Sequence, residues 1–245
     1  MITALVDGDL ILYRTAFSCT VDVEWEEGIV SRTLDLDEAM DSFKQVLYDI
    51  QGAISPDHLV LCFSDTKNFR KGLWANYKAN RKETPKPVGF NQFKERLLNN
   101  PAINHLIVPT LEADDVMGIM ATSPNVKGEK FIVSLDKDMK TVPGKHLHLG
   151  TFETFEVSEP EADFFFYTQV LTGDSSDGYR GCPGVGPVKA AKILGDGSHA
   201  WKKIVAAYGG DEPYALLMAR MARILRHSDY DFNKKEPILW RPSST

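Results

Sequence analysis

Short apolar runs of strand length recur through the first half of the chain, separated by stretches with helical spacing. Strands are predicted over residues 4–6, 58–63, 103–108 and 130–134. Helices are predicted over 35–50, 90–99 and 112–121, where apolar positions recur every three or four residues. The apolar residues of 10–13 fit a helix or an extended segment equally well. Strands that alternate with helices predict an α/β fold with a mostly parallel sheet.

Two further patterns complete the predicted organisation. Residues 21–34 alternate around a Glu-Gly pair and predict a surface hairpin, and the pattern from about residue 159 onward is almost wholly helical. We therefore expect an α/β core over 1–158 and a helical region over 159–245.

Acidic residues follow three of the predicted strands. Asp7 follows the strand at 4–6, Asp65 follows 58–63, and Asp136 and Asp138 follow 130–134. Ligands of open parallel sheets bind beyond the carboxyl ends of the strands, so these side chains are expected to converge. Further acids open the helix at 112 or lie in the second half of the chain: Glu112, Asp114, Asp115, Asp174 and Asp177.

So many carboxylates in one place favour a bound cation. Like charges raise one another's pKa and oppose folding unless a cation compensates them. Hard oxygen ligands suit Mg²⁺ or Mn²⁺, whereas zinc prefers His and Cys. Two such ions about 4 Å apart can hold a phosphodiester, generate hydroxide and stabilise the leaving oxygen. The sequence therefore predicts a site for two divalent ions. The alternative for any single acid is a helix cap or a solvated charge.

Composition narrows the class of protein. The chain has 245 residues, 43% of them hydrophobic, which is enough for a folded core. It shows no apolar run of membrane-spanning length and no leader pattern, so we expect a cytoplasmic protein without membrane contact. Its three cysteines are widely spread, which argues against a disulfide framework or a zinc site.

The net charge of −6 conceals a strongly basic segment. Residues 67–86 hold seven Lys and Arg and one Glu, a local charge of +6, which leaves −12 for the rest of the chain. Trp74 and Tyr77 lie among these cations, as expected of a grip on single-stranded nucleic acid. The alternative is an exposed charged loop. The candidate DNA-binding residues of this segment are Arg70, Lys71, Tyr77, Lys78 and Arg81.

A glycine-rich turn leads into a helix in the second half of the chain. Gly184, Val185 and Gly186 form its centre, and Lys189 and Lys192 follow one helical turn apart. Glycines let backbone N–H groups approach a ligand closely, and a helix N-terminus favours phosphate. This pattern predicts sequence-independent gripping of a DNA backbone by a helix–hairpin–helix motif over about 173–195.

The motifs LVDGDLILYR, FSD, YKANR, LEADDVMG, SLDKDM and GDSSDGYRGCPGVG, in this order, resemble the 5′ nuclease superfamily. That superfamily includes flap endonucleases and the 5′ nuclease domain of bacterial DNA polymerase I. The whole chain is most similar to the 5′→3′ exonucleases of short-tailed bacteriophages. The resemblance implies a PIN-like sheet, a basic helical arch over about 67–88, and hydrolysis of duplex DNA from 5′ ends in phage DNA replication or degradation.

The resemblance also implies a role for each site residue. Asp7, Asp65, Glu112 and Asp114 would hold one metal ion, and Asp136, Asp138 and Asp177 the second, with Asp115 and Asp174 close by. Lys78 and Arg81 would steer and polarise the phosphate. In relatives the glycine turn can also hold K⁺. Asp9 matches a position that is not acidic in many relatives and receives no role. Residues 178–180 and 196–212 depart from cellular members, which leaves flap handling open.

Two other functions are compatible with parts of the sequence. Asp7 and the segment 173–177 resemble those of a haloacid-dehalogenase phosphatase, in which Asp7 would be a covalent nucleophile. That alternative leaves the acids of 112–115, the basic segment and the glycine turn unexplained. A non-catalytic DNA-binding module would keep the glycine turn but would not need every acidic position. Flap and RNA–DNA hybrid substrates remain open, and we expect a monomer.

Overall fold

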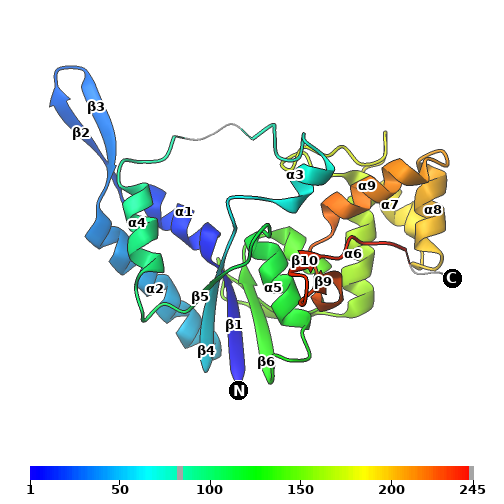
Figure 1. Cartoon of the computed structure of the whole chain (residues 1–245), viewed down its shortest axis with the longest axis horizontal. Coiled ribbons are helices and arrows are strands. Elements are labelled where there is room, and N and C mark those ends of the chain that lie inside the picture. Colours follow the sequence, from blue (N-terminus) through cyan, green and yellow to red (C-terminus); the bar gives the residue numbers. More distant parts are fainter. Residues whose placement is uncertain (82–84, 243–245) are drawn as a thin grey trace.

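The computed structural model describes residues 1–81 and 85–242. A six-stranded sheet lies at the centre of the first part of the chain, in the order β5-β4-β1-β6-β7-β8 (Figure 1). Neighbouring strands are parallel except for the antiparallel pair β7–β8, so the predicted mostly parallel sheet is confirmed. The strands are β1 (Ile2–Asp7), β4 (His58–Phe63), β5 (His105–Ile107), β6 (Glu129–Ser134), β7 (Gly144–His148) and β8 (Thr154–Val157).

Helices cover both faces of this sheet. One apolar core joins the sheet to α1 (Gly8–Ser18), α2 (Leu36–Ile54) and α4 (Phe90–Leu98), and a second joins it to α5 (Ala113–Thr122). Helix α2 begins after Asp35, whose carboxylate accepts the backbone N–H groups of Asp37 and Glu38, and it buries residues such as Phe43 and Ile50. The ambiguous segment 10–13 is helical because Asp7 caps α1 at the end of β1.

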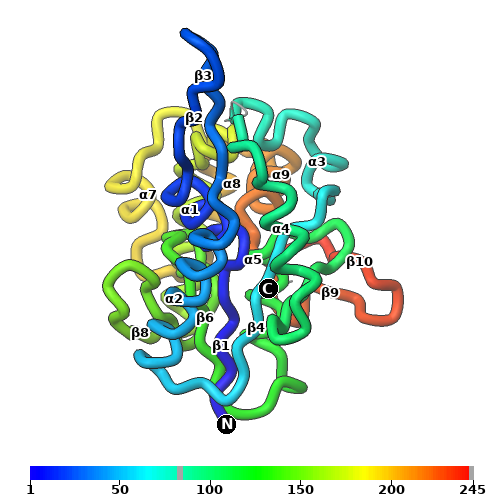
Figure 2. The backbone as a smooth tube through the Cα atoms, turned by 90° about the vertical axis from the view of Figure 1, so that its left-hand side faces the viewer, coloured from blue at the N-terminus to red at the C-terminus, as the bar shows by residue number. Residues whose placement is uncertain are grey.

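The predicted hairpin consists of β2 (Thr20–Glu26) and β3 (Ile29–Leu34), and it projects away from the body of the molecule (Figures 1 and 2). Its base is tied to the chain that enters α4. The Leu34 backbone N–H donates to the Val88 carbonyl at 2.9 Å, and the Val88 N–H donates to the Arg32 carbonyl at 2.9 Å. The hairpin therefore meets the far end of the basic segment.

The region after residue 158 is mainly helical, as its pattern predicts. Helices α6 (Glu159–Thr172), α7 (Pro187–Leu194), α8 (Ala200–Ala207) and α9 (Glu212–Ala222) share a core of their own. The chain then returns to the sheet: Ile224, Leu225 and Tyr230 pack in the core of α5, next to η2 (His227–Asp229), β9 (Tyr230–Asp231) and β10 (Glu236–Pro237). The division at residue 158 stays a prediction, and the returning segment joins the two parts.

The described residues at the start of the basic segment lie over the carboxyl ends of the strands (Figure 1). It begins with α3 (Phe69–Leu73), and residues 74–81 then run above the acids of the sheet. Lys82 and Glu83 of this segment lie outside the described residues. η1 (Lys137–Thr141) follows β6 and carries Asp138 in its first turn. No helix in the described part of the chain is long and apolar enough to cross a membrane.

Candidate metal centre and nucleic-acid interface

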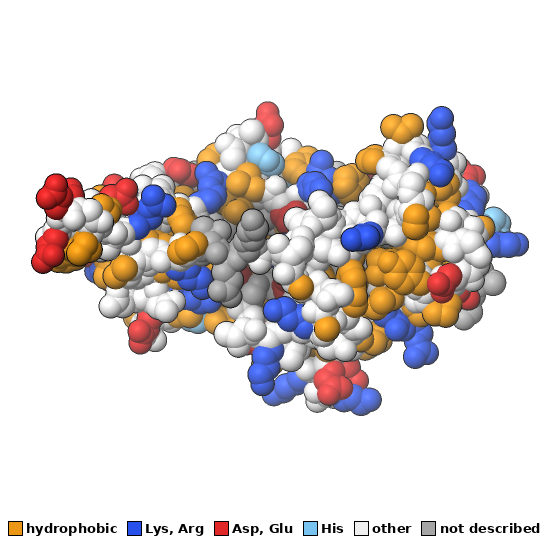
Figure 3. Space-filling model, turned by 90° about the horizontal axis from the view of Figure 1, so that it is seen from above, with side chains coloured by type: hydrophobic (Ala, Val, Ile, Leu, Met, Phe, Trp, Pro, Cys, Tyr) orange, Lys and Arg blue, Asp and Glu red, His pale blue; other side chains and the backbone are white. Residues whose placement is uncertain are grey.

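The acids at the strand ends line one cleft of about 530 Å³. Seen from above, acidic side chains are visible in a hollow at the middle of the molecule, with Lys and Arg side chains around it (Figure 3). The structure brings all nine predicted metal ligands to this cleft, together with Asp9, Lys78 and Arg81. The nine are Asp7, Asp65, Glu112, Asp114, Asp115, Asp136, Asp138, Asp174 and Asp177.

The buried carboxylates near β1 have raised pKa values. Asp7 accepts the Leu10 N–H at 3.0 Å and the Ser134 hydroxyl at 3.0 Å. Burial raises the pKa of Asp7 to about 6, and the charges of Asp9 and Asp136 act in the same direction. Burial also raises the pKa of Asp114 well above its ordinary value, with Asp7 and Asp136 adding to the effect. A cation among these side chains would remove this penalty.

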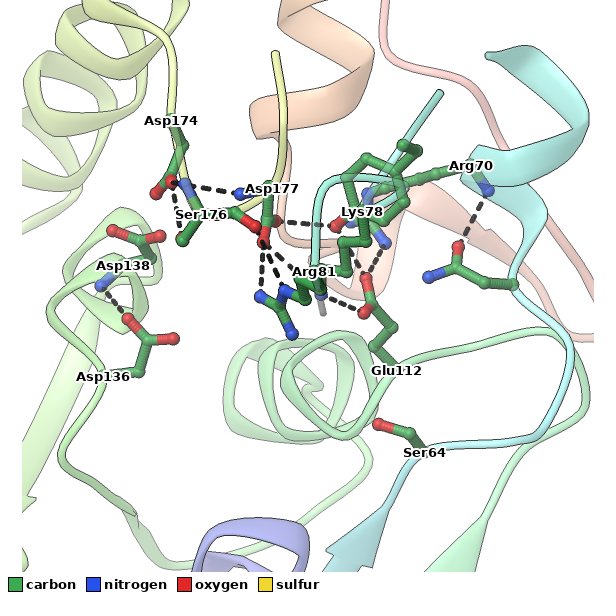
Figure 4. Close-up of polar contacts among 12 residues, drawn as sticks. Ser64, Arg70, Lys78, Arg81, Glu112, Asp136, Asp138, Asp174, Ser176 and Asp177 are labelled. Atoms are coloured by element: carbon green, nitrogen blue, oxygen red, sulfur yellow. Dashed lines mark hydrogen bonds and ion pairs between the residues drawn. The ribbon is translucent and has the colours of Figure 1, made fainter. Parts of the chain in front are cut away.

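Asp138 and Asp174 face each other on the other side of the cleft (Figure 4). Burial raises the pKa of Asp138 to about 7, and the charges of Asp136 and Asp174 raise it further. The Oδ1 atom of Asp138 is buried and finds no hydrogen-bond partner among the described residues. Asp174 instead accepts the Ser176 N–H and hydroxyl, both at 2.6 Å. An orphaned carboxylate oxygen beside a second carboxylate fits a hard divalent cation.

Asp65 lies at the end of β4 and is already well bonded. Its carboxylate accepts the Thr66 N–H at 2.7 Å and the Thr110 N–H at 2.8 Å. These backbone hydrogen bonds, with the Thr110 bond the largest effect, lower the pKa of Asp65. Asp65 is therefore ionised at neutral pH and fixed in orientation.

The basic segment is docked onto the acids by Lys78 and Arg81. The Lys78 ammonium donates to the Glu112 carboxylate, and it lies 3.7 Å from Asp177. Arg81 donates to Asp177 at 2.6 Å (Figure 4). Burial alone would raise the pKa of Glu112, but the charges of Arg70 and Lys78 lower it to about 2. The two cations predicted to meet the phosphate thus pair here with predicted metal ligands.

Within residues 1–81 and 85–242, no three His, Cys, Asp or Glu side chains are arranged so that they could hold one ion. Three of the nine acids are instead engaged by basic side chains, since Glu112, Asp115 and Asp177 all form ion pairs. A metal-binding arrangement therefore requires these pairs to loosen. The donor set itself remains all-oxygen and fits Mg²⁺ or Mn²⁺.

Three of the predicted contacts are corrected by the structure. Arg70 is only 3% exposed and pairs with Asp115 at 2.7 Å, so its side chain is closed to DNA. Both carboxylate oxygens of Asp115 are used by this pair and by backbone N–H groups, so Asp115 has no free oxygen for an ion. Tyr77 is 2% exposed, and its hydroxyl lies within hydrogen-bond distance of both Glu112 and Asp177 and donates to one of them at a time, so its ring cannot stack on a base.

The backbone segments on either side of Asp174 and Asp177 approach each other closely at two glycines. Gly173 and Gly181 both have positive φ, and a Cβ on Gly181 would lie 2.3 Å from the Gly173 nitrogen. This contact fixes the turn that carries Asp174 and Asp177 against the segment that follows.

The predicted DNA contacts of the second half that are exposed lie at the start of α7. Gly184, Gly186, Lys189 and Lys192 are exposed, whereas the Val185 side chain is buried, so only its backbone can face a ligand. Gly186 caps α7, and no side chain covers the first backbone N–H groups of that helix. Lys71 is also exposed, on α3.

Two residues without an assigned role hold parts of the site together, and one of them, Asp9, lines the cleft. Asp9 lines it and accepts the Ser64 N–H at 2.8 Å, which ties α1 to the end of β4. Asn80 donates to the Ser175 carbonyl at 2.6 Å and so docks the basic segment on the acidic turn. Asp9 was visible in the sequence as a second acid after the first strand. Asn80 had no signal of its own beyond its place in YKANR.

Comparison with known proteins identifies the family. Residues 3–164 match the model of the 5′-3′ exonuclease N-terminal resolvase-like domain. The chain belongs to the 5′-3′ exonuclease family. It is 33% identical to the exodeoxyribonuclease of phage T3, over 98% of this chain and 93% of that protein, and 33% identical to the exonuclease of phage T7.

Solved structures agree with the fold of this 5′-3′ exonuclease family member. The 5′-exonuclease of phage T5 with bound zinc superimposes with a TM-score of 0.68 over 91% of this chain and 89% of that one, at 14% identity. A flap endonuclease of phage T5 in a pseudo-enzyme–product complex with DNA and metal ions gives a TM-score of 0.67 at 15% identity. At such identities the likeness shows the fold alone. Membership of the exonuclease family favours a nuclease over the phosphatase and the non-catalytic DNA-binding module.

Proposed function

We propose that the chain is a 5′→3′ exodeoxyribonuclease that hydrolyses phosphodiester bonds at the 5′ ends of duplex DNA with the help of two divalent ions. The observation that carries this proposal is the cleft itself, in which acids from β1, β4, α5, η1 and the 174–177 turn meet beneath a basic segment. The family assignment supports the same conclusion.

The proposed ligands fall into two groups. Asp7, Asp65, Glu112 and Asp114 would hold one ion, and Asp136, Asp138, Asp174 and Asp177 the other. Mg²⁺ or Mn²⁺ bound there would supply an activated water and stabilise the leaving oxygen. Asp115 is left out of both groups because its oxygens are already saturated.

The chain's own residues orient the substrate. Lys78 and Arg81 would exchange their carboxylate partners for the scissile phosphate once cations neutralise Glu112 and Asp177. The exposed start of α7, with Lys189 and Lys192, would grip the duplex backbone away from the cleft. We also propose that the 184–186 turn binds K⁺ and that the protein acts as a monomer.

The test uses Asp136→Asn and Asp177→Asn with a 5′-labelled duplex, a 5′ flap and an RNA–DNA hybrid, each in Mg²⁺ and in EDTA. Both variants should lose cleavage while they still bind duplex in a gel-shift assay, because the amide keeps the shape but not the charge. Asp41→Asn, in an exposed pair with Lys44, is the matched control and should cleave normally. Magnesium-dependent cleavage by both variants would overturn the proposal. The cleavage rates of the wild-type protein on the three substrates show which of them it prefers.

A further inference from the structure

Arg70 and Asp115 form a closed ion pair beside the cleft. The guanidinium reaches both carboxylate oxygens of Asp115 at 2.7 Å, in the two-pronged geometry that arginine favours. Asp115 is fully buried and Arg70 is 3% exposed. The pair joins the start of the basic segment to α5, across 45 positions of sequence.

The same pair anchors the segment that returns from the helical region. Arg70 donates to the Arg223 carbonyl at 2.5 Å, and Asp115 accepts the Leu225 N–H at 3.1 Å. Because three segments of the chain meet at this pair, neither side chain can swing toward a ligand without breaking bonds to the other two. The pair is therefore a fixed element of the site.

Arg70 also reaches Glu112. Arg70 donates to Glu112 Oε2 at 3.2 Å, and the Tyr77 hydroxyl lies 2.9 Å from the same oxygen. The other oxygen of Glu112 faces Lys78. If Lys78 leaves for a phosphate, Arg70 and Tyr77 keep Glu112 in place.

Charge explains why Asp115 is needed in this arrangement. An arginine beside a metal ligand would oppose a cation, unless another carboxylate balances it. Arg70, Glu112 and Asp115 together carry one net negative charge, so Glu112 stays attractive to a divalent ion while Arg70 holds it. Without the Asp115 charge the trio would be neutral, and a cation would lose that attraction.

We propose that Asp115 and Arg70 are positioning residues, not ligands or DNA contacts: Arg70 orients Glu112, and Asp115 cancels the arginine charge so that the divalent ion is still attracted. This inference rests on the proposed metal-dependent function. Both residues would affect ion binding by way of Glu112, and the effect of changing one would depend on whether the other is present.

The experiment measures Mg²⁺ and Mn²⁺ binding to the DNA-free protein by titration calorimetry. The variants are Asp115→Asn, Arg70→Gln and the double variant, with the same three substitutions at the exposed pair Asp22–Arg32 as controls. Circular dichroism reports whether each variant folds. If the double amide variant does not fold, the apolar pair Arg70→Met with Asp115→Leu replaces it, because buried ion pairs tolerate such replacement.

Asp115→Asn should weaken ion binding roughly 10- to 100-fold, the range found for partners of metal ligands. Removing Arg70 as well restores one net negative charge, so the double variant should bind ions more tightly than Asp115→Asn, but more weakly than the wild type because Arg70 no longer orients Glu112. A double variant that binds as weakly as Asp115→Asn would overturn the inference, since a directly ligating Asp115 predicts that result. A wild-type protein that binds neither ion would overturn the proposed metal dependence, and this inference with it.

Discussion

The stability of the metal-free protein should fall as the pH rises from about 5 to about 8. Asp7 and Asp138 have folded-state pKa values of about 6 and about 7, both above the ordinary value of 3.8. A group whose pKa is raised by folding favours the folded state fully only below its unfolded pKa. That advantage is lost as the pH rises through the folded pKa, because ionisation is then harder in the folded protein.

The size of the effect follows from these shifts. The full shift of Asp7 is worth about 3 kcal/mol, and a little under half of it falls between about pH 5 and pH 8. Asp138 is half-buried, so solvent screening reduces its effect, and its ionisation lowers the free energy of unfolding by about 1–2 kcal/mol between about pH 5 and pH 8. Together they predict a loss of about 3 kcal/mol, or roughly 6–12 °C in Tm for a chain of this size.

Other titrating groups leave the sign unchanged. The lowered pKa of Glu112, about 2, gives stability that is lost only below about pH 4.5, outside the window. Burial lowers the pKa of His146, which favours the folded state as the pH rises and offsets part of the loss. Burial of Asp114 acts with Asp7 and Asp138. The three raised carboxyl pKa values therefore outweigh the one lowered histidine pKa, and stability still falls as the pH rises.

The assay is urea unfolding in EDTA at several pH values, repeated with saturating Mg²⁺. Magnesium binds ionised carboxylates, so it should add most stability at pH 8 and flatten or reverse the pH dependence. Asp138→Asn should remove about half of the slope, whereas the exposed Asp41→Asn should not alter it. Equal or greater stability at pH 8 than at pH 5 in EDTA would refute the electrostatic description of the cleft.

Three shorter predictions address other parts of the site. Gly181→Ala should lower the free energy of unfolding by about 3 kcal/mol in urea, because φ is positive and the new Cβ would clash with the backbone. Gly184→Ala, where φ is positive but the space is open, should lower it by about 1 kcal/mol. Equal losses in the two variants would contradict this packing. Lys189→Ala with Lys192→Ala should make the salt dependence of duplex binding less steep by about 2 in log–log slope, and an unchanged slope would remove them from the interface. Lys78→Ala should reduce single-turnover cleavage far more than duplex affinity, and the reverse result would make Lys78 an anchor.

The sheet and the place of the cleft could be predicted because they depend on local periodicity and on topology. Apolar runs of strand length ended in Asp7, Asp65 and the pair at 136 and 138, and the carboxyl ends of parallel strands meet at one edge. The start of α1 was ambiguous because Asp7 ends a strand and caps a helix at the same position. A four-residue apolar run has no periodicity that separates the two possibilities.

The individual roles in the site were harder to predict, because sequence shows a residue's type but not its burial or its partner. Arg70 and Lys71 are adjacent cations in one basic run, yet Lys71 is exposed, whereas Arg70 is buried and paired with Asp115. Asp114 and Asp115 are likewise adjacent acids at the start of one helix, about 100° apart around its axis, so they face different surroundings. Asp114 points into the cleft with its pKa raised, whereas Asp115 meets a guanidinium.

This contrast explains how a cleft with ten acids can fold before any cation arrives. The raised pKa values of Asp7 and Asp138 let these groups take up protons, and Glu112, Asp115 and Asp177 are balanced by Arg70, Lys78 and Arg81. Of these balancing cations, Arg70 is buried and bonded to two other segments, whereas Arg81 is largely exposed. In the proposed mechanism Lys78 and Arg81 would be exchanged for metal ions and then meet a phosphate, while the buried Arg70 would keep the ligand geometry that the exchange requires.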